Sequence, residues 1–144
     1  MENELAQEDL QSKPRYESCG RQGWFCLLPD LDAWPTSWMG VEKDLAPGQA
    51  LVVCFRPFIE DLASSGMSPK TIRQHVDNLW TVGGEIIRDL HYDPSLRKKT
   101  PDRLLRDVVH EYGGPAVHNG SEEQQRSVDS TSRKLHRFLK QPRP

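Results

Sequence analysis

The sequence has few cysteines and no long apolar run. Its 144 residues hold three cysteines, Cys19, Cys26 and Cys54, an odd and sparse set that fits a reducing compartment better than a disulfide framework. No run of eighteen apolar residues is present, so we expect no membrane-spanning helix. The first ten residues are acidic and lack the apolar core of a secretory signal. These absences favour a cytoplasmic location and no membrane partner.

Motifs for metal, nucleotide or nucleophilic chemistry are also missing. Cys19 and Cys26 lie too far apart for a zinc knuckle and have no second pair. His110 and Glu111 adjoin, but no second histidine follows at the spacing of zinc proteases. The chain has no glycine-rich phosphate loop, and no two carboxylates are set apart as a general acid and base. We therefore expect no metal, no cofactor and no enzymatic activity.

The net charge of −2 conceals an uneven distribution. Residues 1–67 hold 5 Lys and Arg against 11 Asp and Glu, whereas residues 68–144 hold 14 against 10. The first part thus carries −6 and the second +4. A nucleic-acid surface needs a local basic face rather than a basic average, so the second part is where we expect such a surface.

The N-terminal third divides into two segments. Residues 1–22 have little apolar periodicity and predict a flexible acidic arm. Residues 23–47 are rich in tryptophan and proline, and the frequent prolines predict an irregular segment rather than a long helix. Three tryptophans lie in it: Trp24, Trp34 and Trp38. They suit a strap packed on a helical core or a docking surface for a protein partner, and the rarity of exposed aromatic patches on monomers favours the strap.

Residues 48–141 predict a helical domain, and its first helix spans about 48–65. The apolar positions of this helix recur at steps of three and four: Leu51, Val52, Phe55, Phe58, Ile59 and Leu62. Pro57 lies inside the pattern and is expected to kink or divide the helix. Cys54 lies beside the apolar face, where it acts as a small buried hydrophobe.

The second helix, from Ser68 to His91, is the stretch around which the domain is organised. Ser68 is placed to cap it, and Pro69 stands where a missing N–H costs nothing. The rear face is apolar along the whole helix: Ile72, Val76, Leu79, Gly83, Ile86 and Leu90. The adjacent Gly83 and Gly84 indicate close packing against another segment, or a kink, because glycine weakens a helix interior.

Two further helices complete the predicted domain. Thr100 and Pro101 begin the third, whose apolar stripe reaches Tyr112. Ser121 and Gln124 form a capping-box pattern for the fourth, which ends near residue 140. Four helices with short connections and no strand pattern predict an all-α bundle.

The stretch FRPFIEDLASSGMSPKTIRQHVDNLW resembles the N-terminal core-binding (SAM-like) domain of phage integrases and tyrosine recombinases. The family's first helix carries F-x-x-F-x-x-x-L, and its second carries S-x-x-T followed by a Tyr and a Leu at steps of four. The matching positions here are Phe55, Phe58, Leu62, Ser68, Thr71, His75 and Leu79, with His75 in place of the Tyr. The resemblance covers about residues 48–140 and implies a four-helix, SAM-like orthogonal bundle that clamps double-stranded DNA during recombination and integration.

The resemblance points to the start of the second helix and to the last helix as the DNA-binding parts. The positions are Ser68, Lys70, Thr71, Arg73, Gln74, Arg133, Lys134 and Arg137. Lys and Arg neutralise phosphates, and Arg and Gln are types that read base edges. Lys98 and Lys99, in a basic loop, are further candidates. His75 suits either helix packing or direct contact with DNA.

The chain departs from the family in its chemistry. Recombinases cut DNA with a tyrosine of a second, larger domain that also carries an H-x-x-R element. None of the five histidines here has an Arg three residues later, and the chain ends soon after the predicted bundle. We therefore expect a non-catalytic DNA-binding domain. The alternative is a protein-interaction module that docks through Trp24–Trp38.

Overall fold

The computed structural model describes residues 31–141, and this part of the chain is all-α. It holds five α-helices: α2 (Trp34–Trp38), α3 (Leu45–Ala63), α4 (Pro69–Tyr92), α5 (Pro101–Val108) and α6 (Glu122–Lys140). Three short 3-10 turns join them: η2 (Leu31–Ala33), η3 (Glu42–Asp44) and η4 (Pro94–Lys98). The one β-type pairing in the described residues is an isolated bridge between His110 and Gly113. The all-α prediction is confirmed. The acidic arm and Trp24 lie outside the described residues.

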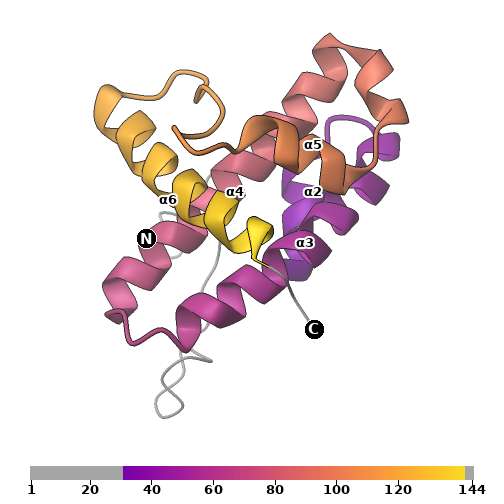
Figure 1. Ribbon diagram of the computed structural model, residues 1–144. Helices are drawn as coiled ribbons and strands as arrows, with labels where there is room; N and C mark the ends of the chain where they lie inside the picture. Colours follow the sequence, from indigo (N-terminus) through magenta and orange to yellow (C-terminus); the bar gives the residue numbers. More distant parts are fainter. Residues whose placement is uncertain (1–30, 142–144) are drawn as a thin grey trace, which may run out of the picture.

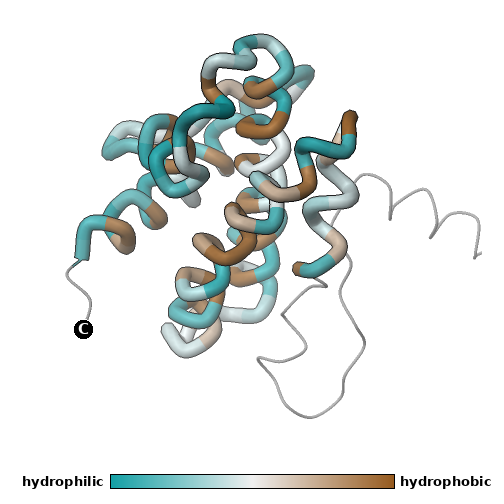
Figure 2. Tube along the Cα trace, turned by 90° about the vertical axis from the view of Figure 1, so that its right-hand side faces the viewer, coloured by the Kyte–Doolittle hydropathy of each residue, from teal (hydrophilic) through white to brown (hydrophobic). Residues whose placement is uncertain are grey.

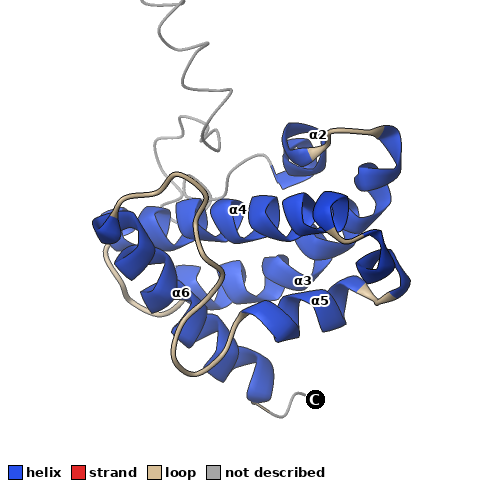
Figure 3. Ribbon diagram, turned by 90° about the horizontal axis from the view of Figure 1, so that it is seen from above, coloured by secondary structure: helices blue, strands red, loops and turns tan. Residues whose placement is uncertain are grey.

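Helix α4 is the central element of the fold. It is connected to α3 by the short turn at residues 64–68, and α6 crosses it on one side (Figure 1). Helix α2 lies on the other side of α4, as the view from above shows (Figure 3). Helix α5 and the loop that follows it lead the chain to α6. The termini of α4 are therefore in contact with different parts of the molecule.

The sequence of α4 accounts for its start and for its buried face. The Ser68 hydroxyl accepts a hydrogen bond from the Thr71 backbone N–H at 3.2 Å, so it caps the helix as predicted. All six residues of the predicted rear face are buried. Gly83 faces the indole ring of Trp38, which occupies the space that a side chain would need. The close-packing interpretation of the glycine pair is therefore confirmed.

The core is formed by the apolar faces of α3, α4, α5 and α6. The apolar positions recur along each helix between hydrophilic stretches (Figure 2). All six apolar positions predicted for α3 are buried. That helix runs through Pro57 without division. The missing N–H of Pro57 leaves the carbonyl of Val53 without its helical donor. Val53 is 70% exposed, so water can bond to that carbonyl.

Three sequence predictions are wrong in detail. The segment before α3 is not irregular throughout, because Pro35 stands in the first turn of α2, where proline is tolerated. Helix α3 begins at Leu45, three residues earlier than expected. Tyr112 does not continue the third helix: α5 ends at Val108, and Tyr112 is 79% exposed after the turn that the bridge closes.

Candidate nucleic-acid interface

The start of α4 presents one cation and two hydroxyl groups at the surface. Ser68, Lys70 and Thr71 are all exposed. The Ser68 hydroxyl donates to the Thr71 hydroxyl at 2.9 Å while it accepts from the Thr71 N–H. Capping therefore engages both hydroxyls, and Lys70 is the group at this end that is ready to meet an anion.

Gln74 and His75 pack against α6. The Gln74 side-chain amide donates to the Ser127 hydroxyl at 3.2 Å. His75 is 6% exposed, and its Nδ1 lies 2.7 Å from the hydroxyl oxygen of Thr131. Of the two interpretations of His75, helix packing is the one that agrees with this burial, and the ring is not accessible to DNA.

Asn78 completes this polar contact between α4 and α6. Its side-chain amide donates to Thr131 Oγ1 at 2.8 Å and lies 2.9 Å from Ser127 Oγ. Because Thr131 Oγ1 accepts from Asn78, its own proton is available to His75 Nδ1, which favours the neutral ring with its proton on Nε2. Burial lowers the pKa of His75, and the charge of Lys134 lowers it further. Both effects keep the ring neutral at physiological pH.

Lys134 and Arg137 lie on α6 next to the turn that precedes α4. Both line a crevice of about 160 Å³ together with Ser65 and Met67 of that turn. Lys134 is also near enough to His75 to influence its pKa. The second half of α6 is therefore adjacent to the start of α4, which are the two regions that the sequence resemblance singled out.

The cations of this region differ from the other basic cluster in their ion pairs. Within residues 31–141, no carboxylate lies at ion-pair distance from Lys70, Lys134 or Arg137. We call these three residues the basic surface. Near η4 and α5, by contrast, four cations of the same range pair with carboxylates and only Lys98 does not: Arg97 pairs with Asp44, Lys99 and Arg103 with Asp107, and Arg106 with Asp102.

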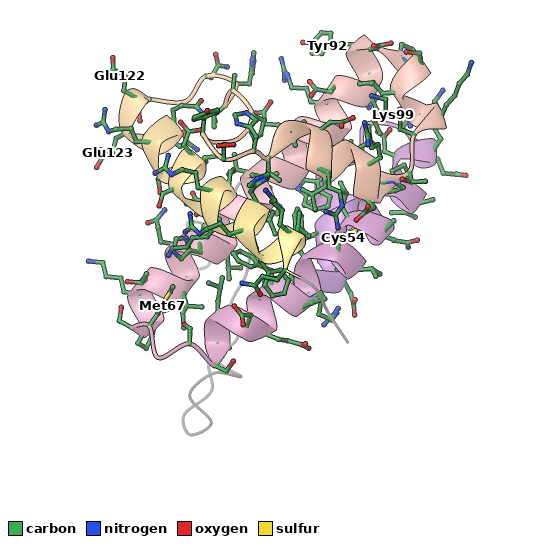
Figure 4. All side chains as sticks on the ribbon, viewed as in Figure 1. Cys54, Met67, Tyr92, Lys99, Glu122 and Glu123 are labelled. Atoms are coloured by element: carbon green, nitrogen blue, oxygen red, sulfur yellow. The ribbon has the colours of Figure 1, made fainter. Side chains whose placement is uncertain are left out.

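Lys98, Lys99 and Arg133 lie apart from the basic surface. Lys98 and Lys99 follow the C-terminal end of α4, and a helix of 24 residues is about 36 Å long. Figure 4 shows Lys99 and Met67 at opposite ends of the molecule. The Arg133 guanidinium donates to the carbonyl of Tyr112 at 3.4 Å, so it faces the loop before α6. Arg73 is exposed on the first turns of α4.

Sequence reasoning missed a buried carboxylate that joins the segment before α3 to the end of α4. Asp44 is 1% exposed and accepts from the backbone N–H groups of Gly40 and Val41 at 2.8 and 3.0 Å. His91 Nε2 and Arg97 Nη2 each lie 2.7 Å from its oxygens. Burial alone would raise the pKa of Asp44, but these donors, Arg97 foremost, hold it well below its usual range. No local pattern in the sequence pairs Asp44 with residues some fifty positions away.

No group of three metal-ligating side chains occurs between residues 31 and 141. Burial raises the pKa of the Cys54 thiol, which keeps it protonated and unreactive. None of the helices in this part of the chain is both long and apolar enough to cross a membrane. No protein-family model, curated protein or solved structure matches the chain significantly.

Proposed function

We propose that this chain is a non-catalytic module that binds double-stranded DNA through the basic surface. The observation that carries the proposal is the difference in ion pairing between its two basic regions. Lys70, Lys134 and Arg137 have no carboxylate partner among the described residues, whereas Lys99 shares Asp107 with Arg103. Cations that are already paired gain less from a phosphate, because they must first give up the carboxylate.

The relation to integrase core-binding domains is part of this proposal. In that family the start of the second long helix and the last helix lie against DNA. The contact of α4 with α6, through the hydrogen bonds of Gln74 with Ser127 and of His75 with Thr131, supports the same use here. A cytoplasmic location and a SAM-like arrangement of the helices belong to the proposal on the same basis.

The contacts are proposed to be with phosphates rather than with bases. Ser68 and Thr71 bond to each other, and Gln74 bonds to Ser127, so three of the polar side chains at the start of α4 have intramolecular partners. The Lys and Arg side chains of the basic surface remain available, and their charges attract a DNA duplex of any sequence. We therefore propose weak sequence preference and strong salt dependence.

Docking of a protein through Trp24–Trp38 receives no support from the described tryptophans. Trp34 is 2% exposed and meets the ring of Phe55 edge-on, and Trp38 covers Gly83. The Trp38 indole N–H also donates to the carbonyl of Trp80 at 3.0 Å. Trp34 is therefore part of the helical core, and Trp38 packs against it with part of its ring left exposed, so we do not adopt docking through Trp24–Trp38 as the function of the chain.

Two double variants with equal loss of charge test the proposal. Lys134→Ala with Arg137→Ala removes two cations of the basic surface, and Lys99→Ala with Arg103→Ala removes two cations that pair with Asp107 near the other end of α4. Fluorescence anisotropy with a labelled duplex of random sequence gives the affinity of each. We expect the first pair to weaken binding about tenfold or more and to reduce the salt slope by about 2, since each lost phosphate contact removes about 0.9.

The second pair is the matched control and should leave affinity nearly unchanged. Circular dichroism must show unchanged helix content for both proteins. Equal losses in the two double variants would mean that DNA follows net charge only, and the assignment to the basic surface would be wrong.

A further inference from the structure

A second surface feature lies on the half of α4 that is remote from the basic surface. It is a groove of about 660 Å³ between the end of α2, the second half of α4 and residues 117–124. Trp38, Trp80 and Tyr92 contribute aromatic rings to it, and Val117 adds aliphatic surface. Tyr92 is 72% exposed and points away from the helices at the end of α4 (Figure 4).

Hydrogen bonds fix the aromatic walls in position. The Trp80 indole N–H donates to the Ser37 hydroxyl at 2.9 Å, and the Trp38 indole N–H donates to the Trp80 carbonyl at 3.0 Å. Gly84 lies on the lining of the groove, where the absence of a side chain leaves room. Rigid aromatic walls lose little entropy when a ligand binds.

Arg88 is the arginine of the groove, and its present hydrogen-bond partners are neutral. Its Nη2 donates to the Tyr92 hydroxyl at 2.8 Å and lies 3.1 Å from His118 Nε2. The guanidinium carbon also stands 5.2 Å from the centre of the Tyr92 ring. His118 is itself positioned by its backbone N–H, which donates to Glu85 at 2.9 Å.

No carboxylate among the described residues forms an ion pair with Arg88. The guanidinium is therefore oriented by neutral acceptors and forms no ion pair, and Asp89 and Glu85 balance its charge only from a distance. An incoming carboxylate would replace neutral acceptors with a charged, bidentate one, which is the stronger interaction.

We infer that this groove is a docking site for an acidic, hydrophobic peptide segment of a partner protein. The aromatic and aliphatic walls accept a large apolar side chain, and Arg88 accepts a neighbouring Asp or Glu. Charge complementarity selects this occupant over a nucleic acid. A phosphate backbone needs a row of cations, but the groove has one Arg and also contains Glu85. The inference is independent of the proposed DNA binding.

Peptide phage display on the full chain tests the inference. A random twelve-residue library is selected on the wild-type protein after depletion on the Arg88→Gln variant. We expect recovered peptides to combine Asp or Glu with Trp, Phe or Leu. Synthetic copies should bind wild type with micromolar Kd and bind Arg88→Gln about tenfold or more weakly, the loss typical of one charged hydrogen bond.

Three further variants show whether the groove itself is responsible. Arg88→Lys keeps the positive charge but loses the bidentate hydrogen bonding of the guanidinium, so it should bind the peptides with intermediate affinity. Trp80→Ala should also weaken binding, whereas Arg126→Gln, an exposed cation on α6 outside the groove, should not. Arg88→Gln should retain the melting temperature and the DNA affinity of wild type.

Other results would overturn the inference. A selection that yields no wild-type-specific peptide would show that the groove is closed to partners in the full chain. Basic peptides, or acidic peptides that bind Arg88→Gln equally well, would assign the contact to another surface.

Discussion

Gly83 and Gly84 are adjacent in α4 but have different surroundings, so replacing each by alanine should change the free energy of unfolding differently. A Cβ atom on Gly83 would collide with the six-membered ring of Trp38, which is enclosed between α2 and α4. A Cβ atom on Gly84 would lie 3.4 Å from Trp38 Cδ1, an ordinary contact. The sequence predicted close packing at this pair, but it did not show which glycine is close or what it approaches.

We predict that Gly83→Ala destabilises the protein by about 1–3 kcal/mol, because the core must shift to admit a methyl group. Gly84→Ala should stabilise it by about 0.5–1 kcal/mol, since alanine favours the helix and meets no obstacle. Urea unfolding of both variants measures the two changes. Equal effects from the two substitutions would mean that Trp38 does not pack on Gly83.

Removal of the Asp44 carboxylate is expected to lower the free energy of unfolding strongly. The carboxylate is buried and has four donors, so its removal leaves Arg97 and two backbone N–H groups without an acceptor. We predict that Asp44→Ala costs about 3–5 kcal/mol in urea unfolding. Asp107→Ala is the matched control: its pairs with Lys99 and Arg103 are largely exposed, and its loss should cost less than about 1 kcal/mol. Similar costs for the two would contradict the role given to Asp44.

At the scale of elements, the contact between α4 and α6 makes stability depend on pH. The pKa of His75 in the folded protein lies below its ordinary value of 6.5, chiefly because the ring is buried. The unfolded chain therefore binds a proton at a pH where the folded protein does not. The stability that depends on the neutral His75 ring is fully present above about pH 6.5, and it decreases as the pH falls through that value.

We predict that wild type loses more unfolding free energy between about pH 7 and pH 5 than His75→Gln does. Asp44 does not affect this comparison. Because its pKa in the folded protein is lowered, its protonation changes stability only at pH values below the ordinary pKa of an aspartate. Chemical denaturation at the two pH values gives the comparison. If both proteins lose the same amount, His75 is not a buried neutral residue.

Capped helix starts and core faces could be predicted from the sequence because they depend on local patterns, whereas the start of α3 and the end of α5 could not. The Ser68 and Thr100 caps and the apolar steps of α3 and α4 all occur as expected. The prolines before α3 predict only that no long helix forms there, and the five-residue helix α2 fits this because Pro35 occupies a permitted position. The Asp44 contacts and the pairing of Asn78 with Ser127 depend on tertiary proximity, which a single sequence does not encode locally.

At the scale of the whole molecule, the two basic regions differ in their ion pairs as well as in their position. The sequence predicts candidate DNA-binding cations near both ends of α4. The fold separates them into a paired cluster near η4 and the basic surface at the other end. Which cations have carboxylate partners could not be predicted, because Lys99 and Asp107 meet only after the turn into α5 forms.

The most direct test of the account is the affinity of the wild-type chain for a labelled random duplex, measured by anisotropy over a series of salt concentrations. With three phosphate contacts from Lys70, Lys134 and Arg137, we predict that log K falls against log salt with a slope of about −3. Binding should be similar for duplexes of different sequence. No binding at low salt, or an affinity insensitive to salt, would contradict the proposal that this chain grips DNA by its phosphates.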